Sequence, residues 1–180
     1  MTKIRVNKIE AARRQIDAAI RMLFSNEDSI AIHTLAMASF RIVRDLSEKR
    51  KENNMHKRIK SIFKPGMEKE FWKELQVPAN FLKHADNDPD GILENIKDEA
   101  NEWVLFIACL YYKDLGFQYT PEMTVLVTWY FVLHPEYLRK EVFQIKQLLV
   151  EAGSDIKGLK RIDQLAFCKQ LLQRMKPVTV

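Results

Sequence analysis

The stretch VPANFLKHADNDPDG, residues 77–91, concentrates the side chains of this sequence that could do chemistry. Asn80, Lys83 and His84 stand three and four positions apart, so on a helix they would share one face. An imidazole exchanges protons near neutral pH, and an amide and an ammonium group beside it can hold an oxyanion. The spacing predicts a catalytic group for metal-free phosphodiester cleavage. In it, His84 would act as general base on a ribose 2′-hydroxyl or as general acid on the leaving oxygen.

The second half of this stretch matches the opening of a calcium-binding loop, Asp-x-Asp-x-Asp-Gly. Calcium needs several oxygen ligands, and a sharp turn at the glycine brings them round one centre. The twelfth position of such a loop supplies a bidentate carboxylate, but here that position is Lys97. The matching residues are Asp86, Asp88, Asp90 and Gly91.

A helix start is the alternative interpretation of the same residues. Asp88 would cap the helix, because its carboxylate can accept hydrogen bonds from the first free N–H groups. Pro89 suits the first helical position, and Asp90 and Glu94 would lie near the positive end of the helix dipole. Capping predicts a helix over about 92–115 without any ligand.

His33 offers a third possibility. It lies within the apolar pattern of a helix predicted over residues 28–50, which is typical of a histidine satisfied in the core. If that helix packs against the one carrying His84, His33 would instead face His84. His33, His84 and Asp86 would then form a transition-metal site.

The positive charge of the chain is unevenly distributed. The net charge is +5, and residues 49–64 hold seven Lys or Arg against one acid. Such a run is typical of a solvated helix end, but it also suits a phosphate-facing patch. The residues that we expect to contact nucleic acid in the second case are Lys57, Arg58, Lys60 and Lys64.

Apolar residues recur at three- and four-residue steps along most of the chain, which predicts helices. No convincing strand alternation is present, so we expect an all-α, antiparallel bundle of six to eight helices. Residues 1–118 would form the main bundle, and residues 119–180 would add C-terminal helices packed on the same domain. The helices are predicted over 3–24, 28–50, 67–85 with a kink or new start at 77–78, 92–115, 121–133, 135–152 and 159–175.

Cysteine use and hydropathy predict a cytoplasmic protein without membrane contact. Cys109 and Cys168 lie in apolar helical patterns and fit reduced, buried thiols. The longest apolar runs, at 103–112 and 125–133, are shorter than the ~18 residues expected of a membrane span. The sequence has no Gly-rich phosphate loop, Cys-x-x-Cys or His-Glu-x-x-His motif, so no cofactor is expected.

The run Ala79–His84, near the end of a predicted helix, resembles the signature of the HEPN superfamily, in which an arginine and a polar residue precede a histidine. The segment IAIHTLAMASFRIVRDL also resembles the Ala-rich helices that pack against the motif in that family. The resemblance covers about residues 5–115. It implies a helical bundle, often a homodimer whose two motif copies meet in one cleft. Active members are metal-independent RNases of defence, toxin–antitoxin and RNA-processing systems, and other members are binding modules.

Residue by residue, Asn80 and His84 match the motif, whereas its arginine falls on Ala79. Lys83, or Arg41 or Arg44 of the helix over 28–50, would have to supply the missing charge. The main expectation is an RNA-directed protein, either a weak metal-independent RNase or a non-catalytic RNA-binding relative. The alternatives are a protein–protein interaction module of a bacterial defence or toxin–antitoxin system, and a metal-binding helical protein.

Overall fold

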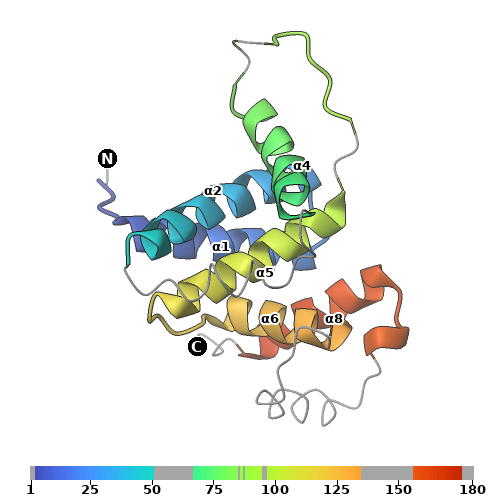
Figure 1. Ribbon diagram of the computed structural model, residues 1–180. Coiled ribbons are helices and arrows are strands. Elements are labelled where there is room, and N and C mark those ends of the chain that lie inside the picture. Colours follow the sequence, from blue (N-terminus) through green and yellow to red (C-terminus); the bar gives the residue numbers. More distant parts are fainter. Residues whose placement is uncertain are drawn as a thin grey trace.

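The computed structural model describes residues 3–50, 67–84, 86, 88–94, 97–134 and 156–175. Within these ranges the regular structure consists of six α-helices and one short 3-10 helix, without strands. The predicted all-α bundle is therefore confirmed (Figure 1). The helix predicted over 135–152 lies outside the described residues. The elements are α1 (Lys8–Phe24), α2 (Ser29–Glu48), α4 (Met67–Phe81), α5 (Asp98–Asp114), α6 (Pro121–Leu133), η3 (Ile156–Gly158) and α8 (Arg161–Met175).

Helices α1 and α2 form a hairpin whose two starts are capped by side chains. The Glu10 N–H donates to Asn7 Oδ1 over 2.9 Å, and the Ala31 N–H donates to Asp28 Oδ1 over 2.9 Å. Between the helices, Asn26 adopts a left-handed φ of 53°, a conformation in which asparagine is enriched. A connection this short folds α2 back along α1, and the two helices pack side by side.

Helix α5 crosses this hairpin and forms the centre of the core. Every residue from Val104 to Cys109 is at most 2% exposed, so the helix is enclosed on all sides along this segment. Helices α6 and α8 cover the other side of α5 and also contact α1. Aromatic contacts join these layers: Phe106 stacks on Tyr130 with ring centroids 4.1 Å apart. None of the described helices is long and apolar enough to cross a membrane.

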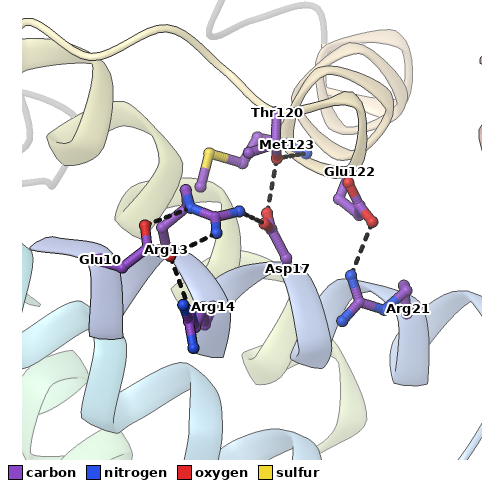
Figure 2. Close-up of polar contacts among 8 residues, drawn as sticks. All are labelled: Glu10, Arg13, Arg14, Asp17, Arg21, Thr120, Glu122 and Met123. Atoms are coloured by element: carbon purple, nitrogen blue, oxygen red, sulfur yellow. Dashed lines mark hydrogen bonds and ion pairs between the residues drawn. The ribbon is translucent and has the colours of Figure 1, made fainter. Parts of the chain in front are cut away.

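A polar network connects α1 to the start of α6 (Figure 2). The Asp17 carboxylate, only 5% exposed, accepts from Arg13 Nη1 over 2.8 Å and from Thr120 Oγ1 over 2.7 Å. One turn further along α1, Arg21 Nη1 donates to Glu122 Oε1 over 2.8 Å. Each of these buried carboxylates therefore has an arginine partner, which offsets the cost of removing its charge from water.

Helix α4 packs on α2 and α5 through aromatic rings, on the side away from α6 and α8 (Figure 1). The Trp72 ring stacks on Phe40 with centroids 5.2 Å apart and meets Trp103 edge-on at 5.6 Å. Ala79 is buried further along the helix. The chain remains helical through Pro78, so no new helix starts at 77–78.

The start of α5 differs from the sequence expectation. The helix begins at Asp98 rather than near 92, and Asp88 does not cap it. Instead the Gly91 N–H donates to Asp88 O over 2.9 Å, which closes a tight turn. Ile92 is 84% exposed, so the apolar pattern that suggested a longer helix includes a residue outside the core. The capping interpretation of Asp88 is therefore wrong.

Candidate functional site

Asn80, Lys83 and His84 lie together where α4 ends. The helix stops at Phe81, and its last turn is tightened because the Asn80 carbonyl accepts two backbone N–H groups. These come from Lys83 over 3.0 Å and from His84 over 3.2 Å. Lys83 and His84 therefore occupy a turn after the helix, where the sequence had predicted a helix to about 85. All three side chains are exposed.

A fourth side chain reaches this group from α2. Arg41 Nη2 donates to Asn80 Oδ1 over 3.0 Å, across 39 positions of sequence. The sequence named Arg41 and Arg44 as possible sources of positive charge for this region, and Arg41 makes the contact. We call Arg41, Asn80, Lys83 and His84 the α2–α4 cluster.

The α2–α4 cluster brings two positive charges, those of Arg41 and Lys83, near one another. Partial burial, and after it the charge of Arg41, lowers the pKa of Lys83. Within the part of the chain that the structure describes, neither Arg41 nor Lys83 forms an ion pair. Arg44, one turn along α2, is different: it pairs with Asp45 at 2.9 Å and with Glu48 at 3.5 Å.

The His84 imidazole is open to solvent. Its side chain is 62% exposed, and Nδ1 lies 3.9 Å from Oδ1 of Asp86, which is itself 75% exposed. A pair this long and this exposed contributes little to stability. His84 is therefore accessible for proton exchange with a ligand and is not committed to a structural bond by this carboxylate.

Ala79, where the HEPN resemblance would place an arginine, faces the core instead. It is 2% exposed and belongs to the hydrophobic core, whereas its neighbour Asn80 is exposed. A guanidinium group at this position would enter the core rather than the α2–α4 cluster.

His33 lies in the core and has a defined partner. It is 1% exposed, and its Nδ1 lies 2.8 Å from Asn101 Oδ1. The Asn101 amide nitrogen donates to Ser29 O and Oγ, so Asn101 Oδ1 is the acceptor and His33 Nδ1 carries the proton. His33 Nε2 is buried without a hydrogen-bond partner. Asn101 had no role in the sequence analysis, and its only signal was a polar residue in an apolar helix.

The predicted metal sites do not assemble in the structure. Among the described residues, no three His, Cys, Asp or Glu side chains gather closely enough to hold a metal ion. His33, His84 and Asp86 are therefore not brought together, because His33 is enclosed in the core while the other two are exposed. Asp86, Asp88 and Asp90 likewise do not surround one centre.

The basic run over 49–64 falls largely outside the described residues, and Lys57, Arg58, Lys60 and Lys64 all do. Their expected contact with nucleic acid stays a prediction. No protein-family model, curated protein or solved structure matches this chain.

Proposed function

We propose that this protein is directed at RNA and that its α2–α4 cluster binds and can cleave the phosphodiester backbone without a metal ion. The observation that carries the proposal is the placement of the exposed His84 imidazole in the same turn as Lys83, beside Arg41, which is hydrogen-bonded to Asn80. The arrangement combines the imidazole of His84, which can exchange protons, with Arg41 and Lys83, which have no anionic partner among the described residues. The resemblance of the run 79–84 to the HEPN signature supports the same function.

In this mechanism the cations hold a backbone phosphate and stabilise the negative charge that develops on it. His84 removes the proton from the ribose 2′-hydroxyl, whose oxygen attacks phosphorus, or it protonates the leaving 5′-oxygen. The products are a 2′,3′-cyclic phosphate and a 5′-hydroxyl. One histidine serves one of these two proton transfers. The proposal therefore includes a homodimer in the cytoplasm, in which the partner's copy of the cluster serves the other.

The burial of Ala79 favours a second form of the proposal, which is RNA binding without cleavage. An arginine at that position would enter the core, so the arrangement of the HEPN signature is incomplete on α4 itself. The α2–α4 cluster retains its positive charge in this form, and His84 acts as a hydrogen-bond donor rather than as an acid or base.

The test is to incubate purified full-length protein with a panel of single-stranded and structured RNAs, with and without EDTA. Wild type is compared with His84→Ala and with Gln76→Ala, a control at an exposed position of the same helix. Binding is followed at several salt concentrations, because phosphate contacts weaken as salt rises. Circular dichroism confirms that each variant is folded.

Cleavage that survives EDTA and disappears only in His84→Ala supports the catalytic form. Salt-dependent binding without cleavage supports the second form. Cleavage that EDTA abolishes, or that His84→Ala retains, contradicts the metal-free mechanism. Indifference to every RNA contradicts both forms and favours a module that binds another protein.

A further inference from the structure

The geometry points to a phosphate-binding site in which Arg41 of α2 takes the part of the arginine that α4 lacks. Lys83 is the second residue that binds the phosphate. Asn80 is a positioning residue that holds Arg41. The inference rests on the proposed function where it identifies the phosphate as part of RNA. The oxyanion site itself follows from the contacts of the α2–α4 cluster alone.

Asn80 uses one side of its amide to hold Arg41, in addition to the oxyanion contact that the sequence predicted for it. Its Oδ1 accepts from Arg41 Nη2 at 3.0 Å, so the acceptor side of the amide is used within the protein. The amide nitrogen is left as a donor, which suits an anion and cannot take a proton from a substrate. Asn80 therefore belongs to the binding arrangement and does not share the proton transfer with His84.

Arg41 keeps most of its hydrogen-bonding capacity for a ligand. A guanidinium group has five N–H donors, and the structure shows one Nη2 contact, to Asn80. Its planar fork can donate to two phosphate oxygens at once, which an ammonium group cannot do. Because Asn80 fixes one side of the fork, less side-chain freedom is lost when the other side binds.

The charge of the site is not neutralised from within the described chain. Arg41 and Lys83 are close enough for the charge of Arg41 to lower the pKa of Lys83. The Asn80 and Pro78 carbonyl oxygens at the end of α4 accept backbone N–H groups, at distances of 2.9 to 3.2 Å. Two like charges held close together, neither with an ion-pair partner of its own among the described residues, are a favourable place for a phosphate.

Arg44 provides a matched comparison on the same helix. It is also an arginine of α2, with its guanidinium 5.6 Å from the ring of Phe40, which stacks on Trp72 of α4. Unlike Arg41, it is paired with Asp45 and Glu48. A site-specific effect must therefore distinguish Arg41 from Arg44, whereas a general effect of positive charge would not.

The experiment titrates isotope-labelled full-length protein with inorganic phosphate and, separately, with a short oligouridylate. NMR signals of the Arg41 Nε–H and the Asn80 side-chain amide are followed. Loss of Arg41 in Arg41→Gln should weaken phosphate binding about tenfold or more, because charge-assisted hydrogen bonds are lost. Arg44→Gln should change phosphate binding less than about twofold, because the Arg44 charge is already paired with Asp45 and Glu48.

Two Asn80 variants test the positioning role. Asn80→Asp keeps an acceptor for Arg41 but places a negative charge in the site, so phosphate binding should disappear while Arg41 stays held. Asn80→Ala should weaken binding less than Arg41→Gln does and should move the Arg41 Nε–H signal. An unchanged Arg41 signal in folded Asn80→Ala would overturn the positioning role.

The two probes separate this inference from the proposed function. Phosphate binding that depends on Arg41, without any binding of oligouridylate, supports the site and contradicts its use for RNA. Oligouridylate binding that Arg41→Gln and Arg44→Gln weaken equally leaves RNA binding in place and overturns the site. If both probes bind and Arg41→Gln weakens each more than Arg44→Gln does, the phosphate site and its use for RNA are both supported. If phosphate does not bind, the site is overturned.

Discussion

Thr120 Oγ1 lies 2.7 Å from Asp17 Oδ1 and also accepts from the Met123 N–H at 3.2 Å. One hydroxyl thus donates to a buried carboxylate of α1 and caps the first turn of α6 (Figure 2). It serves both the packing of the two helices and the start of one of them.

Thr120→Val should lower the free energy of unfolding by about 1–3 kcal/mol, because it leaves a buried carboxylate oxygen without its donor. Urea unfolding followed by circular dichroism measures the change. Thr124→Val is the control, since the Thr124 hydroxyl donates only to the backbone carbonyl of its own helix. Equal losses in the two variants would contradict a special role for the contact between Asp17 and Thr120.

The stability of the protein should carry a pH dependence from Asp17. Burial raises the pKa of this carboxyl group above its ordinary value of 3.8, and the nearby Glu122 raises it further, while Thr120, Arg13 and Arg21 act in the opposite direction. The unfolded chain loses the proton near the ordinary value and the folded chain loses it at higher pH. The contribution of this group is therefore fully present below 3.8 and is lost as pH rises through the raised pKa.

The measurement is the free energy of unfolding of wild type minus that of Asp17→Asn, by urea unfolding at a series of pH values. This difference should fall as pH rises above the ordinary carboxyl value. Thr34→Ala, which removes no ionisable group, serves as the reference variant. A difference that instead grows with pH would show that Arg13 and Arg21 outweigh the effect of burial.

His33→Ala should destabilise the fold by about 1–3 kcal/mol, because Asn101 Oδ1 loses its buried donor. Thr34→Ala, at the neighbouring exposed position, should cost much less. A double-mutant cycle with Asn101→Leu should give a coupling of at least about 0.5 kcal/mol. A melting temperature of wild type that rises with added zinc, and of His33→Ala that does not, would restore the metal hypothesis.

Ala79→Arg should destabilise the protein severely and should not create activity. The position is 2% exposed in the core, and an unpaired charge placed there is removed from water. Gln76→Arg, on the exposed face of the same helix, should be nearly neutral. Thermal unfolding of both variants decides the matter: a stable, more active Ala79→Arg would mean that α4 is rotated relative to its position in the structure.

Local signals were sufficient for several helix boundaries. The predicted ranges 28–50 and 121–133 start within a residue of α2 and α6, where Asp28 and Thr120 are the caps, because capping depends on residues within one turn. The same reasoning failed at Asp88, where the residues suit a cap but the following Ile92 remains exposed. A cap determines where a helix can begin, whereas burial decides whether it does.

Only the part of the candidate site that is local in sequence could be predicted. Asn80, Lys83 and His84 could be grouped because they are neighbours in sequence. The contact of Arg41 with Asn80 depends on which face of α2 meets α4, and the pairing of His33 with Asn101 depends on how α5 crosses α2. Hydrophobic periodicity shows which side of a helix is buried, but it does not identify the helix opposite.

The α2–α4 cluster exists only while α4 is docked, since Arg41 comes from one helix and the other three side chains from the end of the second. A phosphate held there would bind the docked state alone, so its binding energy would add to the free energy of local opening of α4. Amide hydrogen exchange in α4 should slow with phosphate concentration while exchange in α6 stays unchanged. Through this linkage, phosphate bound at the site would also stabilise the packing of Trp72 against α2 and α5.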